Sequence, residues 1–182
     1  MRILAISGSL RSTSSNTALL RAAQILAPPG VDIMLYANLG VLPHFNPDLD
    51  GETPPQSVLE LRAEVGFADG LLISSPEYAH GVPGCLKNAL DWLAASVEFP
   101  GKAVALLDTS SRATHARAQL TEILTTMSAR LVPEASVTIA LPLATIRPLP
   151  KNMATSASSK SMPRPASTAS SRSHQIQKCL TH

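Results

Sequence analysis

The chain has 182 residues, of which 45% are hydrophobic, 15% charged and 3% aromatic, with a formal net charge of +2. This length suffices for one substantial hydrophobic core, no run approaches the roughly 20 apolar residues of a membrane span, and no signal-peptide cleavage pattern precedes residue 8. Two cysteines are too few for a disulfide framework. From these features together we expect a soluble, cytoplasmic protein that binds neither membranes nor nucleic acid.

A polar loop follows the first predicted strand. Residues 2–7 form a short, nearly continuous apolar run, which is typical of a strand buried on both faces of a parallel sheet. Gly8 and a stretch rich in Ser, Thr and Arg come next, and a helix is predicted from its periodicity, with Ser15 or Asn16 as N-cap. Hydroxyls and free amides at a helix N-terminus suit a phosphate dianion, and the guanidinium of Arg11 can bind two of its oxygens.

The same residues are also compatible with an ordinary polar connection and a solvated arginine. Neither Gly-x-Gly-x-x-Gly nor Gly-Lys-Ser/Thr follows Gly8, which disfavours a dinucleotide or a nucleoside triphosphate held in the common ways.

A second strand is predicted over residues 31–36 and a helix over residues 57–68. The connection between them, residues 38–56, is rich in Pro, Gly, Asn and Asp. Loops of this length are usually functional or mobile.

A second loop with a defined backbone follows a third strand, predicted over residues 69–75. Two prolines and two glycines lie within residues 76–84, and Pro83 opens a helix that continues to residue 93 with leucines at helical spacing. Main-chain amides beside glycines can bond to the edge of a flat ring, and Tyr78 adds an aromatic edge. Taken alone, Tyr78 is better explained as a half-buried packing residue.

The remaining pattern completes an α/β fold. A fourth strand is predicted over residues 103–108, a helix over residues 113–131 and a fifth strand over residues 136–141. Five strands with crossover helices fit a flavodoxin-like, doubly wound parallel sheet in the order 2-1-3-4-5, whose ligand crevice lies between strands 1 and 3. The polar residues after strand 4 lie at the same edge, where Ser110 or Ser111 is a candidate donor or part of a solvated turn.

Two motifs carry a family resemblance. Residues 3–20 and 71–93 resemble the signature regions of the NADPH-dependent FMN reductase family, flavodoxin-like proteins that include quinone, azo-dye and chromate reductases. The first region, roughly Gly-Ser-x-Arg-x-x-Ser-x-Asn in the family, is matched by Gly8, Ser9, Arg11, Ser14 and Asn16. The second, Pro-Glu-Tyr-Asn-His-Gly-x-Pro-Gly-x-Leu-Lys-Asn-x-x-Asp-Trp, is matched from Pro76 to Trp92, except that Ala79 replaces Asn.

The resemblance implies an FMN-dependent oxidoreductase that takes electrons from NADPH or NADH and passes two of them to a quinone, azo, metal-oxyanion or flavin acceptor. No protein acid, base or nucleophile is required, because the cofactor carries the chemistry. By resemblance, the phosphate contacts are Ser9, Arg11, Ser14, Ser15, Asn16 and Thr17, and the ring and ribityl contacts are Pro76, Glu77, Tyr78, Ala79, Gly81 and Ser110.

The resemblance also implies a homodimer or homotetramer. The helix carrying Lys87, Asn88, Asp91 and Trp92 would pair subunits, and a lone Trp with polar neighbours suits such an interface. The residues themselves also allow a helix packed on its own sheet. In the family the long loop lies near a neighbouring subunit's active site, so Leu42, Pro43 and Phe45 are expected to touch a partner or cover substrate.

The resemblance stops after about residue 142. Residues 146–182 hold six basic residues and no acidic one, whereas residues 1–145 hold nine basic and thirteen acidic residues. We therefore expect a flavodoxin-like domain over residues 1–145 and a basic, Ser- and Pro-rich tail over residues 146–182 that is disordered or irregular. The last helix of the family would be missing or altered. The tail is either a basic extension for an acidic partner or a segment read in a shifted frame, and its loss of hydrophobic periodicity favours the latter.

Two other functions stay open from the sequence. One is a flavin-binding electron carrier, although such carriers tend to be strongly acidic and rich in aromatic residues near the ring, and this chain has six aromatic residues. The other is a defective family member whose altered C-terminus prevents assembly.

Overall fold

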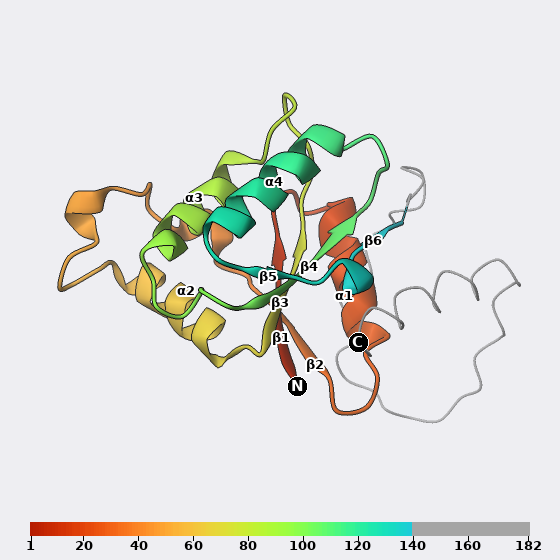
Figure 1. Ribbon diagram of the computed structural model, residues 1–182, viewed down its shortest axis with the longest axis horizontal. Helices are drawn as coiled ribbons and strands as arrows, with labels where there is room; N and C mark the ends of the chain where they lie inside the picture. The colour runs from red at the N-terminus through yellow and green to blue at the C-terminus, as the bar shows by residue number, and fades with distance from the viewer. Residues whose placement is uncertain (140–182) are drawn as a thin grey trace, which may run out of the picture.

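The computed structural model describes residues 1–139, which form one parallel sheet with helices on both faces (Figure 1). The strand order β2-β1-β3-β4-β5 confirms the predicted flavodoxin-like topology. The strands are β1 Arg2–Ser7, β2 Asp32–Leu35, β3 Gly70–Ser74, β4 Ala103–Asp108, β5 Arg130–Leu131 and β6 Val137–Thr138. Register pairs place Ser7 beside Ser74, so β1 and β3 end together at the carboxyl edge of the sheet.

The helices divide unequally between the two faces of the sheet. Helix α1 (Ser15–Ile25) covers one face, and α2 (Gln56–Phe67), α3 (Gly84–Ala94) and α4 (Thr114–Thr126) cover the other (Figure 1). Two buried clusters correspond to these faces, because alternate residues of β1 point to opposite sides: Leu4 and Ile6 join the three-helix side, and Ala5 joins α1. Three short 3₁₀ turns lie in the connections, at Leu39–Val41, Pro47–Leu49 and Pro133–Ala135.

The far edge of the sheet differs from the prediction. The helix predicted to reach residue 131 ends at Thr126, because Ser128 has a φ of 62° and the chain turns. The edge is then built from two short pieces, since β5 pairs with the start of β4 and β6 pairs with its end.

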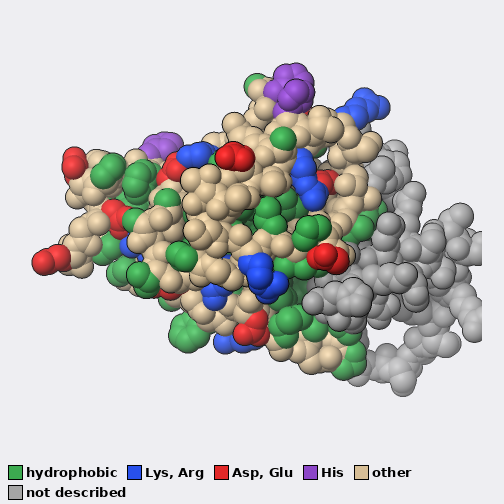
Figure 2. All heavy atoms as spheres, viewed as in Figure 1, with side chains coloured by type: hydrophobic (Ala, Val, Ile, Leu, Met, Phe, Trp, Pro, Cys, Tyr) green, Lys and Arg blue, Asp and Glu red, His purple; other side chains and the backbone are tan. Residues whose placement is uncertain are grey.

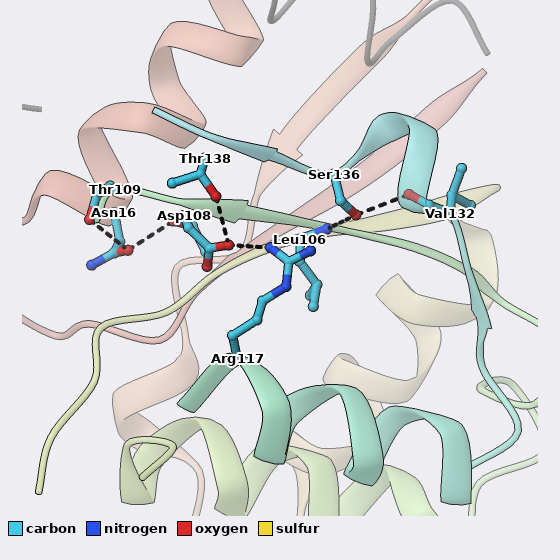
Figure 3. Close-up of polar contacts among 9 residues, drawn as sticks. Asn16, Leu106, Asp108, Thr109, Arg117, Val132, Ser136 and Thr138 are labelled. Carbon is cyan, nitrogen blue, oxygen red and sulfur yellow. Dashed lines mark hydrogen bonds and ion pairs between the residues drawn. The ribbon is translucent and has the colours of Figure 1, made fainter. Parts of the chain in front are cut away.

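Ser136 joins these pieces. Its hydroxyl accepts from the Leu106 amide at 3.0 Å and donates to the Val132 carbonyl at 3.0 Å, so it replaces a missing ladder bond (Figure 3). Of the predicted strand over residues 136–141, the described part forms a strand only at Val137–Thr138, which is the second half of the edge, and residues 140–141 lie outside the described residues.

The predicted tail, the domain boundary after residue 145 and the altered last helix lie outside the described residues. Within residues 1–139, no helix combines the length and apolar character needed to cross a membrane.

Candidate functional site

The loop after β1 is organised by short-range hydrogen bonds among hydroxyl groups. The Ser7 and Thr17 hydroxyls are 2.8 Å apart and share a hydrogen bond, and the Ser9 amide donates to Ser7 Oγ at 3.3 Å. The Arg11 amide in turn donates to Ser9 Oγ at 3.4 Å. These bonds curl the chain at the start of α1 and keep small polar groups at the carboxyl edge of the sheet.

Ser14, not Ser15 or Asn16, is the N-cap of α1. Ser14 has extended backbone dihedrals, and its side chain accepts from the Thr17 amide at 3.3 Å. The helix therefore begins at Ser15, one residue earlier than with Ser15 as N-cap and two residues earlier than with Asn16. Its first turn contains no acidic residue, and the side chain of Arg11 is exposed beside it. The positive end of the helix dipole and this guanidinium together favour an anion.

Asn16, in the first turn of α1, is buried and is hydrogen-bonded to residues at the ends of β3 and β4. Its Oδ1 accepts from the Ser74 hydroxyl at 2.9 Å and lies 3.5 Å from Thr109 Oγ1 (Figure 3). The loops after β1, β3 and β4 thus share one hydrogen-bonded centre. Ser74 and Thr109 were not predicted as site residues, although their position at strand ends is the signal that could have identified them.

The loop after β3 contains a tight hairpin. The Tyr78 and Gly81 main chains exchange two hydrogen bonds, of 3.1 and 2.9 Å. Between them Ala79 and His80 have φ values of 49° and 59°, the left-handed pair of a type I′ turn. The loop protrudes at the carboxyl edge (Figure 1), and 52% of Tyr78 is exposed there.

Glu77 holds this hairpin and does not face an open space. One carboxylate oxygen accepts from the Ala116 amide at 2.9 Å, and the other lies 3.1 Å from His80 Nδ1. The Ala116 hydrogen bond and, to a lesser degree, His80 and His115 hold the pKa of this carboxyl below its usual range. Gln119, which was not predicted, accepts from the Val82 amide at 2.8 Å.

Histidine side chains gather at the tip of the molecule where this loop protrudes (Figure 2). The ring centroids of His80 and His115 are 4.4 Å apart in an edge arrangement. Within residues 1–139, however, no group of three or more His, Cys, Asp or Glu side chains could hold a metal ion.

The two loops meet at Gly8. Its amide donates to the Ser74 carbonyl at 2.8 Å, and a Cβ added there would lie 2.7 Å from Ser75 Oγ. Glycine is therefore required for the close approach of the loops. Cys85 donates its thiol to the Gly8 carbonyl at 3.5 Å, and burial raises its thiol pKa, which supports a packing role.

The remaining predicted contacts lie around these loops. Pro76 and Gly81 are partly buried in the second loop, and Ser15 is partly buried at the start of α1. Ser110, beside Thr109, is partly buried, and its hydroxyl accepts from the Arg112 amide at 3.2 Å, which closes a turn after β4. The structure thus brings all the predicted site residues to one edge of the sheet, from three different loops.

The interpretation of Trp92 as an interface residue is wrong. Trp92 is fully buried within its own chain, its indole donates to the Pro43 carbonyl at 2.8 Å, and its ring meets Phe45 edge-on at a centroid distance of 5.0 Å. Asn88 also bonds to Pro43 and accepts from the Phe45 amide. The long loop is therefore anchored on α3, and subunit pairing through this helix stays a prediction that needs other residues.

Comparisons with known proteins agree with this geometry. Residues 1–141 match the model of the family described as NADPH-dependent FMN reductase. An NAD(P)H-dependent FMN reductase of Pseudomonas aeruginosa is 43% identical over 122 residues, which make up 65% of this chain and 65% of that protein. A quinone reductase of Escherichia coli is 35% identical over 114 residues, 61% of this chain and 60% of that protein. The matches thus span less than two thirds of the length of these relatives.

Among solved structures, FerB, a flavoenzyme NAD(P)H:(acceptor) oxidoreductase from Paracoccus denitrificans, superposes with a TM-score of 0.66 at 33% identity. The superposition covers 72% of this chain and 75% of FerB. Since the family model spans most of the chain and both motifs meet at one sheet edge, the chain belongs to the NADPH-dependent FMN reductase family.

Proposed function

We propose that the carboxyl edge of the sheet binds FMN, with the phosphate in the loop after β1 and the ring against the hairpin after β3. The observation that carries this proposal is the close approach, at Gly8 and Ser75, of two loops: one leads into a helix N-terminus without acidic residues, and the other continues into a main-chain hairpin. This is the point where strand order reverses and where doubly wound sheets bind ligands. The exposed guanidinium of Arg11 and the nearby hydroxyls fit a phosphate dianion.

Each loop has its own set of proposed contacts. The phosphate contacts are Ser9, Arg11, Ser14, Ser15, Asn16 and Thr17. The ring and ribityl contacts are Pro76, Tyr78, Ala79, Gly81 and Ser110. Asn16 and Ser14 also support the loop from below, because both are buried and hydrogen-bonded to neighbouring residues.

We further propose that the chain is an NAD(P)H-dependent oxidoreductase. Bound FMN would supply the redox chemistry, taking a hydride from NADPH or NADH and passing two electrons to a quinone, azo compound, metal oxyanion or second flavin. The chain's own residues bind and orient the reactants. Amides of the hairpin and the positive end of the α3 dipole favour a ligand that gains negative charge. The names of the two relatives above support the donor and the flavin and quinone acceptors.

The proposal extends to a cytoplasmic homodimer or homotetramer acting on small-molecule acceptors. Its test is the visible spectrum of the purified full chain before and after anaerobic addition of NADPH. Flavin that co-purifies and is bleached by NADPH supports the enzyme. Flavin that stays yellow with both NADPH and NADH indicates a carrier, and a chain that binds no added FMN indicates a defective member.

A further inference from the structure

The hairpin at residues 78–81 needs support from outside itself. Ala79 and His80 both adopt the left-handed conformation, which is unfavourable for residues with a Cβ atom. Two main-chain bonds between Tyr78 and Gly81 close the turn, but a hairpin this small is marginal in water. Its place over the edge of the sheet must therefore be fixed by neighbouring elements.

Helix α4 supplies two contacts that bracket the hairpin. Immediately before it, Glu77 Oε2 accepts from the Ala116 amide at 2.9 Å, and immediately after it, Gln119 Oε1 accepts from the Val82 amide at 2.8 Å. The first contact is made by a main-chain amide in the first turn of α4 and the second by a side chain three residues later. Glu77 Oε1 also reaches His80 at the tip.

These contacts do not belong to the hydrophobic core. α4 packs on the sheet through Ala116, Leu120 and Leu124, whereas the side chain of Gln119 is exposed. The N-cap residue of α4, Ala113, makes no side-chain capping bond, and the carboxylate of Glu77 takes that role at the positive end of the helix. Both carboxylate oxygens of Glu77 are thus bonded to groups of the protein.

We propose that Glu77 and Gln119 are positioning residues that clamp the hairpin onto α4 and thereby set the affinity of the site for the flavin ring, an inference that rests on the proposed function. Neither side chain contacts the flavin. Their effect passes through the main chain of residues 78–82, which lies between the two clamped points. Glu77 thus changes role, from a predicted ring contact to a support of the ring loop.

The first experiment uses the full chain without FMN. Hydrogen–deuterium exchange of residues 78–82 is compared in the wild type, Gln119→Leu, Gln119→Glu and Glu77→Ala. Loss of one hydrogen bond should speed exchange roughly 3- to 10-fold in Gln119→Leu and Glu77→Ala, while Gln119→Glu keeps the acceptor and the wild-type rate. The matched control is Gln24→Leu, which also loses a side-chain to main-chain bond, 2.7 Å long, from α1 to Ile33. Unchanged exchange in Gln119→Leu would overturn the clamp.

The second experiment titrates the same proteins with FMN and follows the quenching of flavin fluorescence. We expect Gln119→Leu to bind FMN roughly 3- to 10-fold more weakly, with Gln119→Glu and Gln24→Leu close to the wild type. Equal affinity in Gln119→Leu and Gln24→Leu contradicts the positioning role. A wild type that binds no FMN contradicts the proposed function instead, and the exchange data then decide the clamp independently. If Glu77→Ala fails to fold, the two Gln119 variants still test both points.

Discussion

The two loops of the candidate site are held in different ways. Most side-chain hydrogen bonds of the loop after β1 join residues close in sequence, from Ser7 to Thr17, and Gly8 adds long-range bonds to Ser74 and Cys85. The loop after β3 is held by α4, whose contacts at Ala116 and Gln119 lie 39 and 37 residues further along the chain. The first loop is therefore a local structure that sequence reasoning can read, whereas the second acquires its position only when α4 packs on the sheet.

Removing the charge of the first loop should have the largest effect. We expect Arg11→Ala to weaken FMN binding roughly 30-fold or more, because a charge-assisted contact to phosphate is lost, while the apo protein melts at the wild-type temperature. The measurement is a fluorescence titration with FMN. Arg21→Ala, which removes an exposed arginine further along α1, is the control and should bind normally. Unchanged affinity in Arg11→Ala would show that the phosphate lies elsewhere.

Forcing the two loops apart should come next. In Gly8→Ala the new Cβ would lie 2.7 Å from Ser75 Oγ and 3.1 Å from Leu86 Cδ2. We expect a loss of about 1–2 kcal/mol in the free energy of unfolding, measured with urea, and weaker FMN binding as well. Gly8→Ala combined with Ser75→Gly removes the closest contacts and should recover part of both. If the single variant is as stable as the wild type, the loops do not touch as described.

Replacing Ala79 in the second loop should have a smaller effect, and it should raise the free energy of unfolding where Gly8→Ala lowers it. Ala79 has a φ of 49° where the family motif has Asn, a residue that tolerates this conformation better. We therefore expect Ala79→Asn and Ala79→Gly to raise the free energy of unfolding by about 0.5–1 kcal/mol, measured with urea. Ala118→Gly, at an exposed helical position of α4, is the control and should be destabilising. A loss of stability in both Ala79 variants would contradict the left-handed turn.

Lowering the pH should have the smallest effect, a loss of the stability that Glu77 contributes through the second loop. The pKa of Glu77 is lowered in the folded chain, so its contribution to stability is present above the ordinary carboxyl range near about 4.3 and is lost as the pH falls through the lower, folded value. The stability advantage of the wild type over Glu77→Gln should shrink in that window. Glu77→Gln removes only the carboxylate and keeps His80 and its ring neighbour His115. A difference that stays constant with pH would contradict this.

The comparison also explains which predictions failed. The apolar spacing after β4 predicts a helix through residue 131, but Ser128 adopts a left-handed backbone and redirects the chain into β5. The polar neighbours of Trp92 on α3 favour an interface residue, whereas the structure buries Trp92 within its own chain. Its partners, Pro43 and Phe45, come from a loop more than 40 residues earlier, and no local pattern indicates that they lie against it.

The alternation of strands and helices and the loop after β1 can be predicted from the sequence, since they depend on periodicity, capping residues and hydrogen bonds between near neighbours. The strand order is predicted because this alternation is typical of doubly wound sheets. The bonds of Asn16 to the ends of β3 and β4, the burial of Trp92 and the support of the hairpin by Glu77 and Gln119 instead depend on tertiary packing. Each of these contacts links residues at least 37 positions apart. Such pairs meet because parallel strands end at one edge of the sheet, and that edge exists only once the whole sheet has formed.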